Sequence, residues 1–286
     1  MRIIIIIIII AINNVAMANN QPLKINAGII PIGSLLAMLN TGINNSIGVI
    51  LANQNMSPHE AAINVKEMQA IKDSNVLVLV NRNFEYEIAE NINKDKTQVI
   101  YLDKLLKHVS ADPHFWLDAN IAKEILQELA VELGKIDPKN AKAYLKNAAK
   151  FSAEIADMQK SLQKDFTSVK SHFMVYHEAW NYFIKANGLT NYYKGSITRE
   201  NSSHHDIDTA LGVQDIINLA NFVKKNNVVC IFIEPQFDDA VLMDFIVKHN
   251  IKTAVLNPIG EITNPLSDSY FLMMRENARQ LKSCAS

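Results

Sequence analysis

The chain has 286 residues, of which 49% are hydrophobic, and it carries a formal net charge of −1. This length suffices for two compact domains, and this share of apolar residues excludes a disordered chain. The near-neutral charge, without any cluster of Lys and Arg, argues against nucleic acid or an anionic membrane surface as a partner, which leaves small solutes and other proteins.

The N-terminus has the layout of a cleaved secretory signal. Arg2 is followed by the apolar run Ile3–Ile10 and, shortly afterwards, by Ala16-Met17-Ala18. A short positive region, an apolar stretch of about ten residues and an A-x-A site are typical of such a signal. We therefore predict a signal peptide at residues 1–18 with cleavage near Ala18. The alternative is a buried strand or an uncleaved anchor.

Strand-like and helix-like segments then alternate at short spacing through residues 19–119. Apolar, β-branched runs predict strands, and longer amphipathic segments predict helices. The predicted strands are Lys24–Pro31, Ser46–Ala52, Val76–Val80 and Thr97–Leu102, and the predicted helices are Ser34–Leu39, Glu60–Lys72 and Glu85–Ile92. Because continuous apolar runs between helices indicate parallel strands buried on both faces, we expect one α/β lobe here.

Residues 120–168 have a helical pattern only. An apolar stripe at every fourth position runs from Ile121 to Leu133, and Pro138 then stands at the start of a second long segment. A helix from Pro138 to about Asp165 would be about 42 Å long at 1.5 Å per residue. Since one small lobe does not need a helix of that length, we predict a rigid connector lying along two lobes.

The alternation of strands and helices resumes in residues 169–286, which predicts a second α/β lobe of similar plan. The predicted strands are His172–Tyr176, Val228–Ile233 and Lys252–Leu256, and the predicted helices are Ala179–Asn187, Asp215–Lys225, Asp239–His249 and Ser267–Leu281. Two such lobes create a cleft between them. In open α/β sheets, ligands bind just beyond the carboxyl ends of the strands.

The two cysteines, Cys230 and Cys284, both lie in the part of the chain that we expect to be exported. In an oxidising compartment, two cysteines far apart in sequence indicate one disulfide. Such a bridge would pin the C-terminus to a core strand and contribute about 2–5 kcal/mol. The alternative is two unrelated thiols.

Three of the eight histidines fall where strands or lobes end. His59 follows the second predicted strand across a short loop, His114 precedes the connector helices, and His177 comes directly after the first strand of the second lobe. Neutral imidazole is a strong zinc ligand, and three imidazoles leave one tetrahedral position for water, a carboxylate or an amide oxygen. We therefore predict a site for one metal ion in the cleft, with His204 and His205 as candidates for a secondary metal contact.

The segments around these histidines resemble the zinc/manganese solute-binding proteins of ABC importers, and among them the periplasmic zinc-uptake type. The resemblance covers essentially the whole mature chain, and the matching segments are Pro58-His59-Glu60, Asp112–Asp118, Asp137-Pro138 with Asn140 and Tyr144, His177–Trp180 with Tyr182-Phe183, Gly188-Leu189, Ile233–Phe237 and Asn257–Gly260. It implies two lobes joined by one long rigid helix, with metal in the interlobe cleft.

Residue by residue, the resemblance makes His59 and His114 the ligands from the first lobe and His177 the ligand from the second. Manganese-type relatives usually have a carboxylate at the position of His177, and because hard Mn²⁺ prefers oxygen, the imidazole here favours Zn²⁺. The implied protein is a periplasmic monomer without enzymatic activity that captures Zn²⁺ and delivers it to a membrane permease. The cysteine pair also matches a disulfide of some zinc-type members.

One departure from the family concerns the fourth ligand. The family's aspartate after the last strand is Asn257 here, and a neutral amide is a poorer ligand, so we expect water or Glu60 at the fourth position, with Asn257 as a further candidate. We expect Glu178 and Glu234 to accept the outer ring N–H of ligand histidines. The alternative roles are a helix N-terminal acid for Glu178 and a strand-end cap for Glu234.

The alternatives for the function are a manganese or iron carrier or an adhesin on the same fold, and a zinc hydrolase, because three histidines and an open water position also describe catalytic zinc.

Overall fold

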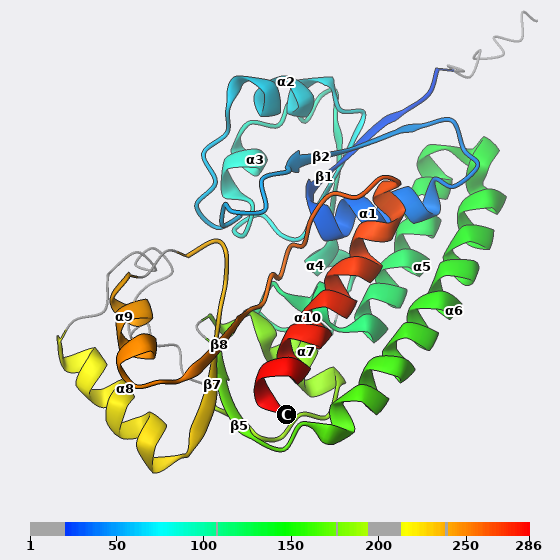
Figure 1. Cartoon of the computed structure of the whole chain (residues 1–286). Coiled ribbons are helices and arrows are strands. Elements are labelled where there is room, and N and C mark those ends of the chain that lie inside the picture. The colour runs from blue at the N-terminus through cyan, green and yellow to red at the C-terminus, as the bar shows by residue number, and fades with distance from the viewer. Residues whose placement is uncertain (1–20, 107, 176, 194–212, 238–239) are drawn as a thin grey trace, which may run out of the picture.

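The structure is a computed structural model that describes residues 21–106, 108–175, 177–193, 213–237 and 240–286. It has two parallel sheets, each flanked by helices (Figure 1), which confirms the predicted fold class. In the described part of the chain, no helix has the length and hydropathy needed to cross a bilayer. The predicted signal peptide, His204 and His205 lie outside the described residues.

The first sheet has four parallel strands in the order β2-β1-β3-β4. Its strands are mostly apolar, and all four residues of β3 are buried, as expected for a sheet covered on both faces. The strands are β1 (Lys24–Ile29), β2 (Ser46–Leu51), β3 (Val76–Leu79) and β4 (Gln98–Tyr101), and the helices of this lobe are α1 (Ile30–Leu39), α2 (Val65–Asp73), α3 (Tyr86–Glu90) and α4 (Leu102–Leu105).

Two helix starts differ from the prediction by more than three residues. Helix α1 begins at Ile30 directly after β1, and not at Ser34, because Pro31 stands in its first turn, where its fixed φ suits a helix. The predicted strand Lys24–Pro31 therefore ends earlier, at Ile29. Helix α2 begins at Val65 instead of Glu60. The Asn64 side chain accepts a hydrogen bond from the Glu67 N–H, and the Glu67 side chain accepts one from the Asn64 N–H, a capping box that fixes this start.

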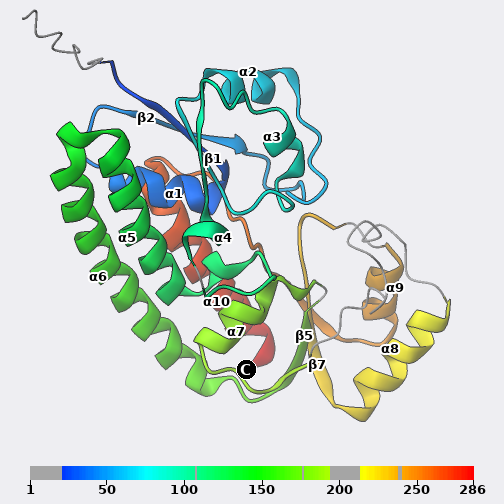
Figure 2. The ribbon, with the colours of Figure 1, turned by 180° about the vertical axis from the view of Figure 1, so that it is seen from behind.

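Two long helices follow, α5 (Ala119–Ile136) and α6 (Ala141–Asp165), joined by the 3₁₀ turn η2 (Pro138–Asn140). They pack side by side (Figure 2), and α6 is about 37 Å long at 1.5 Å per residue. Asp137 anchors their junction: its Oδ2 accepts hydrogen bonds from Asn45 Nδ2 at 3.0 Å, Asn140 Nδ2 at 2.7 Å and Tyr144 Oη at 3.0 Å. The junction is thereby tied to the loop before β2.

The second sheet also has four parallel strands, in the order β6-β5-β7-β8. Its edge strand β6 has only two residues and was not predicted, since so short a strand leaves no pattern in the sequence. The strands are β5 (His172–Val175), β6 (Tyr192–Tyr193), β7 (Val228–Ile233) and β8 (Lys252–Val255), and the helices are α7 (Asn181–Ala186), α8 (Val213–Lys225), α9 (Ala240–Lys248) and α10 (Ser269–Ala285). Short 3₁₀ segments stand at η1 (Phe115–Leu117), η3 (Phe166–Ser168), η4 (Glu178–Trp180) and η5 (Leu266–Asp268).

Helix α10 packs against both lobes. Tyr270 donates from its N–H to Ser34 Oγ at 3.0 Å and from its hydroxyl to the Trp116 carbonyl at 2.9 Å. One continuous hydrophobic core runs from β1 to α10, while a smaller cluster lies under α8 and α9. Because α10 packs against both lobes, they share one core. The predicted lobe boundaries at residues 119 and 168 therefore stay a prediction.

The disulfide between Cys230 and Cys284 is present, as predicted, with the two Cα atoms 5.8 Å apart. It links β7, in the middle of the second sheet, to the last turn of α10. Both cysteines are buried, so the bridge is part of the core that joins the two lobes.

Glu85, just after β3, is a buried carboxyl group with only 1% of its surface exposed. Its Oε2 accepts a hydrogen bond from Val80 N–H at 2.6 Å. Among the described residues, Oε1 has no hydrogen-bond partner, and it fills the space beside Gly28, where an added Cβ would lie 1.8 Å from it. Burial raises the pKa of Glu85 to about 8, against the opposing backbone hydrogen bonds of Val80 and Asn81.

We expect Glu85→Gln to change how the stability depends on pH. The folded-state pKa of Glu85 lies above its ordinary value of 4.5. The contribution of Glu85 to the free energy of unfolding is therefore complete below pH 4.5 and is lost as the pH rises to about 8. At about 1.4 kcal/mol per pKa unit, the decline is of the order of several kcal/mol. Urea unfolding at pH 5, 7 and 9 should show wild type losing stability relative to Glu85→Gln. Parallel curves for the two proteins would contradict a neutral buried acid, and Glu87→Gln, exposed on α3, is the control.

Candidate metal centre

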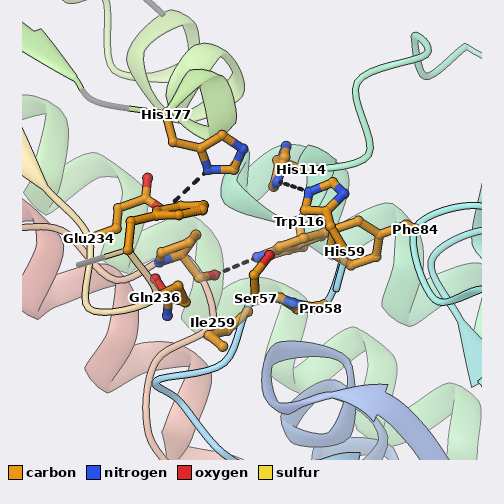
Figure 3. A pocket seen from close by; sticks show the side chains of 12 residues that line it. Ser57, Pro58, His59, Phe84, His114, Trp116, His177, Glu234, Gln236 and Ile259 are labelled. Carbon is orange, nitrogen blue, oxygen red and sulfur yellow. Dashed lines mark hydrogen bonds and ion pairs between the residues drawn. The ribbon is translucent and has the colours of Figure 1, made fainter. Parts of the chain in front are cut away.

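The three predicted histidines meet between the two lobes (Figure 3). His59 comes from the loop after β2, His114 stands directly before η1, and His177 stands between β5 and η4. One ring nitrogen of each lies within 4.8 Å of the others. Among the described residues, this is the one cluster of three or more His, Cys, Asp or Glu side chains placed to share an ion.

The spacing of the His59 and His114 nitrogens fits one small tetrahedral ion. The Nε2 atoms of His59 and His114 lie 3.5 Å apart. Two nitrogens bound to zinc at about 2.0–2.1 Å with a tetrahedral angle are separated by about 3.3–3.4 Å. The cavity between the rings has a volume of about 10 Å³, which is room for one ion or one water molecule.

Asp112 orients His114. Its Oδ1 lies 2.8 Å from His114 Nδ1 and also accepts the His114 backbone N–H at 3.0 Å, so Nε2 is the ring nitrogen that faces the cavity. Burial lowers the pKa of His114, although the hydrogen bond to Asp112 opposes this. Burial acts to raise the pKa of Asp112, but its hydrogen bonds with His114 and Asn181 outweigh burial and lower it.

Glu234 orients His177. Its Oε2 lies 3.2 Å from His177 Nδ1, and its Oε1 accepts a hydrogen bond from Trp180 Nε1 at 2.7 Å. Burial acts to lower the pKa of His177, but the charge and hydrogen bond of Glu234 outweigh it and raise the pKa. The second predicted acid, Glu178, is exposed at the start of η4 and adds to this rise through its charge. Glu234 is thus the acid that contacts the ring of His177.

Aromatic rings surround the histidines. Phe84 lies edge-on to His59 with ring centroids 4.6 Å apart, and Phe237 lies 5.3 Å from His177. Trp116 lies 5.3 Å from His114, and its Nε1 donates to the Pro258 carbonyl at 2.8 Å, which fixes its ring. These rings reduce the contact of the site with bulk water, which strengthens the electrostatic interactions inside it.

Neither predicted protein candidate for a fourth ligand lines the cavity. Glu60 is exposed. The Oδ1 of Asn257 accepts hydrogen bonds from Gln236 Nε2 at 3.0 Å, Ile259 N–H at 3.2 Å and Gly260 N–H at 3.1 Å, so its lone pairs are already engaged. Gln236 also donates to the Gln54 carbonyl at 2.5 Å, which makes this amide cluster a bridge between the two lobes.

The sequence left two of these residues unassigned. Asp112 stands two positions before His114, which is close enough for its carboxylate to contact the imidazole ring. This short spacing was a signal in the sequence for an orienting acid. Phe84 had no such signal, because only the folding of β3 and α3 brings it to His59. Other described histidines have separate partners: His108 pairs with Glu124 at 3.2 Å, and His172 contacts the Asn226 carbonyl at 2.8 Å.

Known proteins resemble this chain in sequence and in fold. The high-affinity zinc uptake system protein ZnuA of Brucella suis biovar 1 is 30% identical over 176 residues, which cover 61% of this chain and 50% of that protein, so the chain spans about half the length of this curated relative. A crystal structure of ZnuA superimposes with a TM-score of 0.78 at 20% identity, covering 93% of this chain and 100% of that one. The laminin-binding protein of Streptococcus agalactiae, described as a bifunctional adhesin and metal transporter, gives 0.77 at 23% identity over 92% and 100%. Residues 42–284 match the family described as zinc-uptake complex component A, periplasmic (ZnuA), and the chain belongs to this family.

Proposed function

We propose that this protein captures one Zn²⁺ ion in the periplasm with His59, His114 and His177 and delivers it to the membrane permease of an ABC importer. The observation that carries the proposal is the convergence of three imidazole nitrogens, from two lobes, on a space that fits one ion. Membership of the zinc-uptake family supports the transport role. In this proposal, residues 1–18 are the export signal, and zinc is the cargo.

The ligand set supports Zn²⁺ over Mn²⁺. Three imidazoles offer no oxygen to the metal, whereas Mn²⁺ prefers carboxylate, carbonyl and water ligands. Asp112 and Glu234 engage the outer nitrogens of His114 and His177, which increases the basicity of each ring and fixes its orientation. A water molecule at the fourth position completes a tetrahedral shell, since Glu60 and Asn257 stand outside the cavity.

The small cavity supports capture over hydrolysis. Catalytic zinc also has three protein ligands and a water, but substrate pockets usually have volumes of about 300–1,000 Å³. The space beside these histidines is about 10 Å³, and Phe84, Trp116 and Phe237 are among the residues that line it. An ester or a peptide does not fit there, whereas a single ion does.

A competition titration tests the choice of metal. We expect the purified protein, stripped of metal, to bind one Zn²⁺ per chain and to retain it against a large excess of Mn²⁺. The measurement is inductively coupled plasma mass spectrometry of the protein after equilibrium dialysis against both ions. Preferential retention of Mn²⁺ would overturn the zinc assignment and favour a manganese carrier on this fold.

We also expect the zinc affinity to fall as the pH drops, because a protonated imidazole cannot bind metal. The pKa of His177 is raised above 6.5, so a proton competes for its nitrogen already near neutral pH, while the lowered pKa of His114 keeps that ring neutral to lower pH. Affinity should decline by about tenfold per pH unit below the pKa of His177, with one proton released per Zn²⁺, and more steeply once the other rings protonate. Isothermal titration between pH 8 and 5.5, in two buffers of different ionisation enthalpy, measures both quantities. An affinity independent of pH would rule out this ligand set.

A further inference from the structure

The loop that carries His114 in the first lobe is bound to the first turn of α7 in the second lobe. Asn181 Nδ2 donates to Asp112 Oδ2 at 3.3 Å. Next to it, the Tyr182 hydroxyl accepts the Ser110 backbone N–H at 3.0 Å and lies 2.9 Å from Ser110 Oγ. Two consecutive residues of α7 therefore contact the loop that positions a ligand of the other lobe.

The Asn181 side chain is itself fixed on both sides. Its Nδ2 also donates to the carbonyl of Glu178 at 2.9 Å, and its Oδ1 accepts the Tyr192 hydroxyl at 3.2 Å. The amide therefore has the one orientation in which Nδ2 faces Asp112. An asparagine is suited to this place because it offers a donor to the carboxylate and an acceptor to the hydroxyl at the same time.

Asn181 controls the oxygen of Asp112 that His114 does not use. Oδ1 of Asp112 faces the ring and the backbone N–H of His114, and Oδ2 is bound by Asn181. With both oxygens engaged, the carboxylate plane is set, and so is the direction in which the imidazole presents Nε2. A group that orients a ligand by direct contact, as Asp112 does here, typically contributes 10–100-fold to metal affinity, and this sets the upper bound for Asn181, which acts through it.

We propose that Asn181 is an interlobe positioning residue for the metal site. It belongs to the lobe of His177, and through Asp112 it aligns His114 of the other lobe, although it does not line the cavity itself. The ligand geometry then depends on a hydrogen bond between the lobes, so the site is complete only when α7 and the loop before η1 are in contact. This inference rests on the proposed function, since it concerns the same zinc site.

A double-mutant cycle on zinc affinity tests it. We expect Asn181→Ala to bind Zn²⁺ about tenfold more weakly than wild type, at the lower end of the range for a partner that contacts the ligand directly. In an Asp112→Ala background the same change should cause less than about a twofold loss, because the group through which Asn181 acts is then gone. Asn226→Ala is the matched control: its side-chain amide donates to the Phe222 carbonyl of the same segment, away from the metal site, and its loss should leave zinc affinity unchanged. Thermal unfolding of each variant without metal verifies the fold, and Asn181→Ser replaces Asn181→Ala if the alanine variant does not fold.

The possible results distinguish a failure of the Asn181 proposal from a failure of the proposed function. Zinc binding by wild type together with wild-type affinity in Asn181→Ala would overturn the role of Asn181 alone. An equal loss in both backgrounds would show that Asn181 acts by another route than Asp112 and would also overturn it. No zinc binding by wild type would instead reject the proposed function. A Co²⁺ complex whose visible spectrum changes in Asn181→Ala, but not in the control, would support altered ligand geometry.

Discussion

Replacing His177 by alanine should weaken Zn²⁺ binding by more than about 100-fold. This loss should exceed the 10–100-fold that removal of an orienting partner causes, because a bond to the metal itself is lost. The second lobe contributes this one histidine to the cluster, so the variant leaves His59 and His114 on the first lobe to hold the ion alone. The measurement is competition with a chromogenic zinc chelator at pH 7.5.

The fold should survive this change, because His177 lies at the cavity and not in the hydrophobic core. Without metal, the variant should still unfold cooperatively, at a temperature below that of wild type, because the buried carboxylate of Glu234 loses its contact with His177. His249→Ala, an exposed histidine at the end of α9, is the matched control and should keep wild-type affinity. Near-wild-type zinc affinity in His177→Ala would mean that the site lies elsewhere.

The second large effect concerns the disulfide. The Cys230→Ala/Cys284→Ala variant should be less stable than the oxidised protein by about 4 kcal/mol, the loop-closure contribution expected for a bridge across 54 residues. The bridge holds α10 to β7, and α10 in turn bonds to Ser34 and Trp116 of the first lobe. The double variant keeps these bonds, so the loss of the bridge should lower the free energy of unfolding without opening the contact between the lobes.

Urea unfolding followed by circular dichroism measures this difference. Wild type treated with a reductant should lose a similar amount of stability, which separates the cross-link from the effect of the new side chains. Zinc affinity at low denaturant should change little, because both cysteines lie outside the cavity. A stability difference below about 1 kcal/mol would contradict the view that this bridge constrains the unfolded chain.

The strands were predictable because each is a short apolar run between polar segments. The bounds of β7 agree with the prediction, and those of the other predicted strands differ mainly at their C-terminal ends. Helix starts were harder, since they depend on local caps: Pro31 and the Asn64/Glu67 pair carried signals that the hydrophobic pattern masked. The contacts of α10 with the first lobe were not predictable, because periodicity shows that a face is buried and not what covers it.

The convergence of the three histidines was predictable, and the groups around them less so. His59 and His177 each follow a parallel strand of their own lobe, at the edge where ligands bind, and the family resemblance added His114 to them. The burial of Glu85 could not be predicted, since an acid before a short helix suggests an exposed N-terminal residue. The carboxyl group is buried because the space beside Gly28 accommodates it. The amide of Asn181 likewise reaches Asp112 only through the packing of the two lobes.

Zinc K-edge X-ray absorption of the one-to-one complex tests the central proposal most directly. We predict a four-coordinate ion with three imidazole nitrogens and one further light atom, all at about 2.0–2.1 Å. Multiple scattering from the imidazole rings should account for three histidines in wild type and two in His177→Ala. A shell of six oxygens, or the same number of imidazoles in both proteins, would contradict a zinc site built from His59, His114 and His177.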